Sequence, residues 1–241
     1  MPTTLPIIRI TRRLARDMQA LDLHTPSHVY NPLRYAWDGH HQYLDRYGAP
    51  KGRVLLVGMN PGPWGMAQTG VPFGDVIMVR DWFHIDMQLA RTLPAQHPKY
   101  PILGMACHRG EGSGSRVWRW ARDRLGPPEA FFERFFVWNY CPLLFLKDGR
   151  NLIPEKLTRA EHDALTVACD HALKSVVRAL EPQAVVGIGR YAERRINEVL
   201  GITADYLPHP SPANPKANKE WPAMAEEALK PWLPRGRVRA G

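Results

Sequence analysis

Three polar side chains stand where apolar segments of the sequence end, and their types are suited to binding and polarising a flat ligand. Asn60 follows the apolar run 54–57, Asn139 ends the run 135–139, and His209 follows a shorter apolar segment. Buried parallel strands would deliver all three groups to one sheet edge, where open α/β sheets bind ligands. An amide can read the imide edge of a pyrimidine, and a histidine can donate to an oxygen on which negative charge develops.

The segment after the first of these strands is the most distinctive stretch of the chain. It reads GMNPGPWGMAQTGVPFG over residues 58–74. Its glycines let the backbone approach a ligand closely, and Phe73 offers a flat apolar face. Asn60 alone would be more typical of a turn, in which its side chain bonds the local backbone. We give it a chemical role because of these neighbours.

Strand-like and helix-like segments alternate along the chain, which predicts a single-domain α/β sandwich of three layers, with a central four-stranded parallel sheet flanked by helices. The expected strands cover residues 53–58, 135–139, 184–188 and 203–207, and the expected helices cover 9–23, 84–93, 116–125, 158–182, 191–200 and 221–232. Thr158 and Glu161 have the form of a capping box. Residues 25–50 read as a loop. We expect one domain over residues 1–241, with its core at about 31–233 and a basic tail at 234–241.

The charge of the chain favours a polyanionic partner. Its 241 residues include 32 Lys and Arg against 23 Asp and Glu, a formal net charge of +9. Nucleic acid is the simplest such partner, ahead of an acidic protein or a membrane. No apolar run approaches the roughly 18 residues of a transmembrane helix, and none follows the N-terminal arginines as in a signal peptide. We expect an intracellular protein, in a bacterial cytoplasm rather than a nucleus.

Neither the cysteines nor the histidines form a metal-binding pattern. Cys107, Cys141 and Cys169 include no C-x-x-C pair, and His108 has no second pair of ligands at metal spacing. The sequence predicts reduced thiols, no metal and no cofactor.

Two glycine-rich segments resemble nucleotide-binding motifs. Residues 187–192 match G-x-G-x-x-A, but no strand ending in an acidic residue follows at the required distance, so a tight strand-to-helix turn is the favoured interpretation. A dinucleotide-dependent oxidoreductase remains the alternative. Residues 110–115 lack the Gly-Lys-Ser/Thr ending of a P-loop, and either a loop beside a phosphate or a flexible surface turn fits them.

Taken together, three segments resemble the uracil-DNA glycosylase superfamily and, within it, the single-strand-selective monofunctional enzymes. They are residues 58–74, 135–143 and 209–219, with weaker similarity near Arg116 and Trp118. The resemblance implies a four-stranded parallel sheet flanked by helices. It also implies hydrolysis of the bond joining uracil to deoxyribose in single- and double-stranded DNA, which leaves an abasic site. We expect a monomer that needs no cofactor.

The resemblance implies two catalytic residues. Asn60 would position the attacking water, and His209 would stabilise the departing uracil anion. A carboxylate beside the water would also attract the cationic sugar, so an asparagine there implies weaker activation and greater dependence on His209. These positions include no lysine for Schiff-base chemistry, in agreement with a monofunctional enzyme.

The resemblance also implies how the flipped base is held. Phe73 would stack on it, and Asn139 would hydrogen-bond its edge. Met59 and Gly62 would line the pocket near C5 of the base, where this family admits 5-hydroxymethyl substituents.

The segment after His209 is expected to contact DNA, as a stiff wedge with lysines that meet phosphates. The residues expected to do so are Pro210, Ser211, Pro212, Lys216 and Lys219. Two positions depart from the family. Ala213 stands where vertebrate members carry an arginine that helps fill the vacated base stack, which predicts a stronger single-strand bias. Trp64 replaces the usual phenylalanine.

Two other functions fit the same residues. One is a superfamily relative whose specificity is shifted toward xanthine or hypoxanthine. The other is a catalytically silent DNA-binding protein that uses only the basic surface.

Overall fold

A four-stranded parallel sheet organises the computed structural model, which describes residues 5–211 and 215–236, with the backbone alone at 215–218. Its strands, in the spatial order β3-β2-β6-β7, are β2 (Val54–Gly58), β3 (Phe135–Asn139), β6 (Ala184–Ile188) and β7 (Asp205–Leu207). Every residue of β2 and β3 is buried, as expected for central strands covered on both faces. The parallel sheet predicted from the apolar runs is confirmed.

A second, antiparallel sheet was not predicted. It has the order β1-β4-β5 and consists of β1 (His28–Tyr30), β4 (Leu144–Lys147) and β5 (Arg150–Leu152). These strands have three or four residues each, too few to show a two-residue alternation in the sequence.

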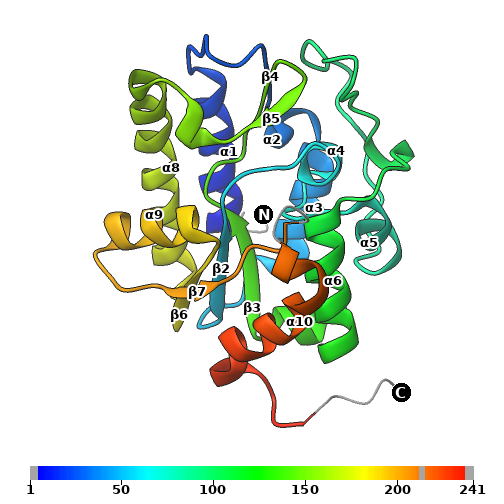
Figure 1. Cartoon of the computed structure of the whole chain (residues 1–241), viewed down its shortest axis with the longest axis vertical. Helices are drawn as coiled ribbons and strands as arrows, with labels where there is room; N and C mark the ends of the chain where they lie inside the picture. The colour runs from blue at the N-terminus through cyan, green and yellow to red at the C-terminus, as the bar shows by residue number, and fades with distance from the viewer. Residues whose placement is uncertain (1–4, 212–214, 237–241) are drawn as a thin grey trace.

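Helices cover both faces of the parallel sheet, with α8 and α9 on one side and α5 and α6 on the other (Figure 1). The α-helices are α1 (Pro6–Gln19), α2 (Pro32–Tyr35), α3 (Trp37–Tyr47), α4 (Met66–Thr69), α5 (Val76–Asp81), α6 (Gly112–Leu125), α7 (Pro128–Phe132), α8 (Arg159–Leu180), α9 (Arg190–Leu200) and α10 (Pro215–Leu229). Short 3-10 helices lie at η1 (Gly104–Ala106), η2 (Pro154–Lys156) and η3 (Lys230–Trp232).

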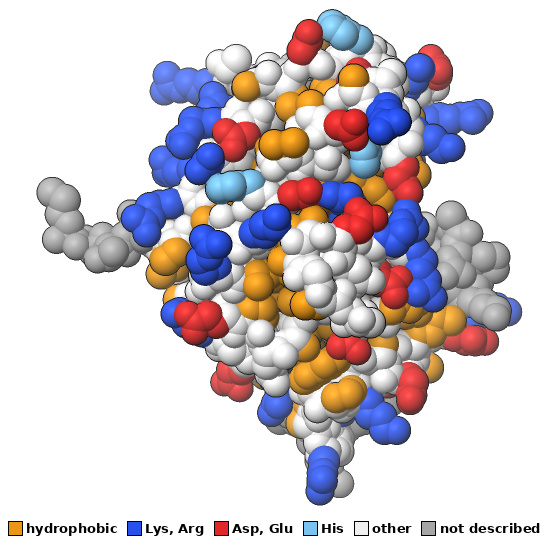
Figure 2. Space-filling view, turned by 90° about the vertical axis from the view of Figure 1, so that its left-hand side faces the viewer, with side chains coloured by type: hydrophobic (Ala, Val, Ile, Leu, Met, Phe, Trp, Pro, Cys, Tyr) orange, Lys and Arg blue, Asp and Glu red, His pale blue; other side chains and the backbone are white. Residues whose placement is uncertain are grey.

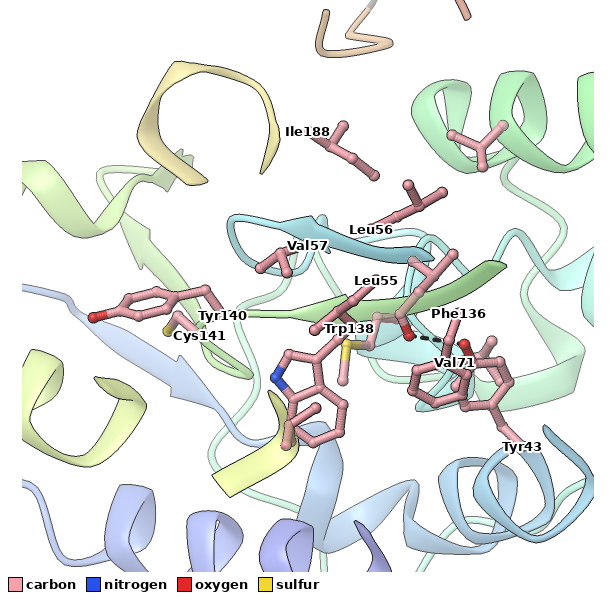
Figure 3. Packing of buried hydrophobic residues seen from close by; sticks show 14 of the residues in the cluster. Tyr43, Leu55, Leu56, Val57, Val71, Phe136, Trp138, Tyr140, Cys141 and Ile188 are labelled. Atoms are coloured by element: carbon pink, nitrogen blue, oxygen red, sulfur yellow. Dashed lines mark hydrogen bonds between the residues drawn. The ribbon is translucent and has the colours of Figure 1, made fainter. Parts of the chain in front are cut away.

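The interpretation of residues 25–50 as a loop was wrong, because this segment contains β1, α2 and α3. Helix α3 is built from His, Tyr and Gly as well as strong helix formers, so its intrinsic propensity is low. Tertiary packing stabilises it instead. Tyr43 is fully buried, and its hydroxyl donates to the Val137 carbonyl at 2.8 Å (Figure 3).

The helix expected over residues 84–93 is absent, and a shorter helix lies just before it. Asp75 caps α5 by accepting from the Met78 amide at 3.2 Å. His84 then takes a left-handed backbone conformation with φ of 52°, and Ile85 and Met87 reach the core from irregular backbone. Their apolar spacing imitated a helix. Elsewhere the helix ends shift by a few residues, and the last helix begins at Pro215 rather than Trp221.

The predicted capping box at the start of α8 is confirmed. Thr158 and Glu161 satisfy each other's backbone amides, and the Glu161 carboxylate also accepts from the amides of His24 and Thr25 at 2.6 and 2.7 Å. One side chain thus caps α8 and fixes the segment between α1 and β1.

The surface of the described residues is charged, and their cysteines are buried. Lys and Arg side chains are interspersed with Asp and Glu over the face drawn in Figure 2. In residues 5–211 and 215–236, no helix is long and apolar enough to cross a membrane, and no group of three His, Cys, Asp or Glu could hold a metal ion. Cys107, Cys141 and Cys169 are free thiols, and all three are buried.

Candidate active site

A cavity of about 380 Å³ lies at the carboxyl ends of β2 and β3. It brings together all the predicted catalytic and base-contacting residues, which are Met59, Asn60, Gly62, Phe73, Asn139 and His209. The predicted DNA-contacting Ser211 also lines it, together with residues that the sequence analysis did not single out: Pro61, Pro63, Met66, Glu111, Ser113, Asn151 and Ile153.

Asn139 is a buried polar residue among those that line this cavity. Asn139 ends β3 directly beside Gly58 of β2, and a Cβ at Gly58 would lie 2.5 Å from the Asn139 Oδ1 atom. The amide nitrogen lies 3.2 Å from the Met66 sulfur, whereas Oδ1 is buried and meets no donor among the described residues. A buried acceptor left unpaired costs about 1–3 kcal/mol. A ligand N–H group in the cavity would remove that cost.

The Asn60 side chain is oriented by a neighbouring loop. Its amide nitrogen donates to the Leu143 carbonyl at 3.1 Å. This bond uses the donor end of the amide, and the Oδ1 acceptor makes no hydrogen bond within the described residues. A carbonyl oxygen in that position can accept from a water molecule and orient it, but it cannot take the proton as a carboxylate would.

The Phe73 ring is held in place by a strained backbone. Phe73 has a left-handed φ of 54°, a conformation that costs a non-glycine residue about 1 kcal/mol or more. Its carbonyl accepts from the Trp118 indole at 2.9 Å and from the Asp75 amide at 2.8 Å. A Cβ at Gly58 would lie 2.7 Å from the ring, so glycine there permits the close approach. The ring therefore forms a fixed flat wall.

His209 enters the cavity as a neutral hydrogen-bond donor. Burial lowers the pKa of its imidazole to about 4, although part of the residue remains open to the cavity. Its Nδ1 atom accepts from the Ser211 amide at 3.1 Å, so the proton of the neutral ring resides on Nε2.

Two side chains fix the backbone on either side of His209. The indole of the fully buried Trp221 donates to the Pro208 carbonyl at 2.8 Å, and the Arg116 guanidinium donates to the Pro210 carbonyl at 2.6 Å. The imidazole is thus positioned by α10 and α6 as well as by β7.

The glycines of the G-x-G-x-x-A segment are explained by packing. A Cβ at Gly187 would lie 2.4 Å from the Glu193 amide nitrogen. Gly189 has a φ of 88°, and a Cβ there would lie 3.3 Å from the Cβ of His209. These contacts favour the tight-turn interpretation, and the second glycine makes room for the histidine.

Glu111 lines the cavity and had not been singled out. Neither a phosphate cradle nor a flexible turn describes residues 110–115, because Glu111 caps α6, which begins at Gly112. Its carboxylate accepts from the amides of Ser113 and Gly114, and its own amide donates to Asp75 at 2.9 Å. Burial raises the pKa of Glu111, and the bonds from the helix amides oppose that rise. Glutamate is not among the preferred N-cap residues, so the sequence carried little signal.

The residues expected to contact DNA are only partly described. Pro210 is buried, Ser211 lines the cavity and Lys219 is exposed on α10. Pro212 lies outside the described residues, as does Ala213. The Lys216 backbone belongs to α10, and its side chain is not described. The ring centroids of Trp64 and Tyr100 lie 5.5 Å apart, and the Arg109 guanidinium lies 4.6 Å from the centroid of the Trp64 ring.

Comparison with known proteins shows the family to which the chain belongs. The family model described as the uracil DNA glycosylase superfamily matches residues 46–232. The chain belongs to this superfamily. The matched residues include every residue that lines the cavity, and they extend from before β2 to beyond α10.

Relatives and a solved structure agree with this assignment. Over 207 residues the chain is 47% identical to a protein of Bos taurus named single-strand selective monofunctional uracil DNA glycosylase, covering 83% of this chain and 76% of the relative. A Mus musculus protein of the same name is 46% identical over 225 residues, covering 90% and 80%. The crystal structure of Pedobacter heparinus SMUG2 shares the fold, with a TM-score of 0.62 at 14% identity over 92% of this chain and 96% of that one.

We expect this superfamily member to lose stability as the pH falls from 6.5 to about 4. Burial lowers the pKa of both His40 and His209 to about 4, from a value of 6.5 for the free side chain. The unfolded chain therefore binds more protons in this range, so the stabilising contribution is complete above pH 6.5 and is lost as the pH decreases to about 4. At pH 5 the loss should be about 2 kcal/mol per imidazole relative to pH 8.

Urea unfolding at both pH values measures this loss. His40 donates to the Gly70 carbonyl at 2.7 Å, and His40→Gln keeps an amide donor there while removing the titrating ring. That variant should lose about half of the acid sensitivity, whereas exposed His171→Gln should behave as wild type. An unfolding free energy that does not change between pH 8 and pH 5 would contradict the prediction.

Proposed function

We propose that this chain is a monofunctional DNA glycosylase that hydrolyses the N-glycosidic bond of uracil in DNA and leaves an abasic site. The observation that carries the proposal is the unpaired, buried Oδ1 atom of Asn139, which shares a cavity with the Phe73 ring and the His209 imidazole. Uracil has a flat ring, an N–H group between two carbonyl oxygens, and a stable anion. These three properties match the three groups.

The reaction follows from the positions of these groups. Phe73 stacks on the flipped base, and the Asn139 amide accepts from N3–H of uracil while its amino group turns to a carbonyl oxygen. The water oriented by Asn60 forms a bond to C1′ as the bond from C1′ to N1 breaks, that electron pair leaves with the uracil ring as an anion, and the surplus proton of the attached water passes to solvent. The Nε2–H group of His209 donates to the carbonyl oxygen that gains negative charge. One such donor is worth about 2.7–4 kcal/mol in the transition state.

The cavity also favours hydrolysis over a covalent intermediate. No lysine is among its described lining residues, so a Schiff base with the sugar has no nucleophile there. Asn60 cannot remove a proton from the water, so the departure of the base must supply most of the driving force. Desolvation of the cavity strengthens the bond from His209.

The substrate range extends the proposal. Met59 and Gly62 line the cavity, and a Cβ at Gly62 would meet only the Glu111 side chain, at 3.6 Å or beyond. This open wall would accept 5-hydroxymethyluracil beside uracil. We include both single- and double-stranded DNA as substrates, with Ser211 and Pro212 as the wedge, the buried Pro210 stiffening the backbone behind it, and Lys216 and Lys219 on the phosphates. Ala213 favours single strands, since it cannot fill a vacated stack.

Single-turnover cleavage of a uracil-containing oligonucleotide tests the proposal. Both strand forms are treated with wild type, Asn60→Ala and the surface control Gln183→Ala, and alkali then breaks the abasic sites. Wild type and Gln183→Ala should cleave equally, and Asn60→Ala should be slower by about 10²-fold because the water is no longer oriented. Binding without any abasic product would favour the silent DNA-binding protein, and cleavage of xanthine or hypoxanthine alone would favour the shifted relative.

A further inference from the structure

A second pocket, lined by other residues than the cavity described above, is surrounded by arginines. It has a volume of about 470 Å³ and lies where α1, α2 and the segment after α5 meet. Its charged lining residues are Arg12, Arg16, Arg34 and Arg91. It shares no lining residue with the Asn139 cavity.

In the part of the chain that the structure describes, no carboxylate pairs with the arginines of this pocket. Within the described residues, none of its four arginines makes an ion pair, and no Asp or Glu lines the pocket. Most other described arginines on helices have such partners, including Arg13 with Asp17 at 3.6 Å. Arg12 and Arg16 are one helical turn apart, an arrangement of like charges that destabilises a helix. An anionic ligand would offset that repulsion.

The chemistry of the pocket points to phosphate groups on a strand that also presents bases. Guanidinium groups bind phosphate oxygens through two parallel hydrogen bonds. The Trp37 indole lines the same pocket, with the Arg12 guanidinium 4.8 Å above it. Aromatic rings between basic groups are the usual means of binding single-stranded nucleic acid, because bases stack on the rings while cations meet the backbone.

An adjoining pocket lengthens the site into a groove. It has a volume of about 460 Å³ and shares Arg34, Tyr35 and Thr92 with the first. Two connected pockets give room for more than one nucleotide. We propose that this arginine groove binds the backbone of a single-stranded nucleic acid outside the catalytic cavity. The inference rests on the proposed function only in taking the strand to be the DNA that carries the substrate.

Salt-dependent binding of the full chain tests the proposal. The probe is a uracil-free DNA single strand of about 30 nucleotides, and binding is followed by fluorescence anisotropy. Arg12→Gln/Arg16→Gln removes two groove charges, and Arg9→Gln/Arg13→Gln removes two charges from the same helix that do not line the groove. The groove pair should weaken binding about tenfold and lower the slope of log affinity against log salt by about 1.4, which is two contacts at about 0.7 each. The control pair should change the slope by less than half as much.

Each other result of the binding measurements overturns the proposal. If both double variants changed the affinity and its salt dependence equally, the DNA would be attracted diffusely to the whole basic surface. If the groove double variant bound as wild type does, the DNA would make no contact in the groove. Inorganic phosphate or polyglutamate that binds the groove as tightly as the strand would make it a small-anion site or a site for an acidic protein. Cleavage of a short uracil oligonucleotide is measured separately and should be unchanged in both pairs. Absence of cleavage by wild type would reject the proposed function and leave the groove result standing.

Discussion

Replacing His209 with leucine should lower the single-turnover cleavage rate by about 10²–10³ while DNA binding stays nearly unchanged. Leucine fills much of the same volume but has no N–H group, so the carbonyl oxygen of the departing base loses its donor. The effect is confined to the transition state because negative charge builds up on the base only as the bond to the sugar breaks. Asn60 supplies no carboxylate to compensate, so we expect the imidazole to be the main source of rate acceleration in the proposed reaction.

Rates of wild type, His209→Leu and the exposed control His171→Leu on one uracil oligonucleotide measure this effect. Because burial lowers the pKa of His209 to about 4, its neutral ring persists through mild acid. The wild-type rate should therefore show no break near pH 6.5, where an ordinary histidine titrates. Comparable rates for wild type and His209→Leu, or a rate that falls as the pH rises through 6.5, would remove a neutral His209 donor from the mechanism.

Asn139→Leu should have opposite effects on activity and stability. Leucine cannot bond the uracil edge, and a site built around such bonds loses about 10³-fold or more in rate without them. The same change removes a buried carbonyl oxygen that meets no donor within residues 5–211 and 215–236. The free energy of unfolding should therefore rise or stay level, whereas removing a well-paired polar group would lower it.

Asn31→Leu is a matched control for this variant. Asn31 is also buried with an unpaired Oδ1 atom, but its amide donates to the Ala15 carbonyl at 3.0 Å and lies outside the cavity. It should leave the cleavage rate unchanged. Urea unfolding and single-turnover kinetics are measured on both variants. A destabilised but active Asn139→Leu would show that Asn139 serves the fold rather than the base.

The site could be predicted from the sequence because its parts follow recognisable strands. Continuous apolar runs identify β2 and β3 as buried, and parallel strands direct the residues after them to one edge. Asn60, Asn139 and His209 could therefore be expected to meet. The capping box at Thr158 could be predicted because it depends only on local backbone bonds.

The parts that could not be predicted depend on contacts distant in the sequence. Helix α3 is stabilised by Tyr43 reaching across to β3, and the strands β1, β4 and β5 are too short to carry a pattern. Ile85 and Met87 fill the core from irregular backbone, so their spacing was misleading. Glu111 is brought to the cavity by a cap that statistics disfavour. In each case tertiary packing overrides local preference.

The order of the strands along the sequence sets the order in which a newly made chain acquires the parts of the site. Strand β7 lies at the edge of the sheet beside β6, and both strands follow β2 and β3 in the sequence. Ribosomal synthesis releases Asn60 and Asn139 first, His209 much later, and Trp221, which fixes the backbone before His209, later still. A chain whose translation stops before His209 would hold the two amides of the proposed site and lack the imidazole proposed to donate to the departing base. Only translation products that extend beyond Trp221 would then carry every part of the proposed site.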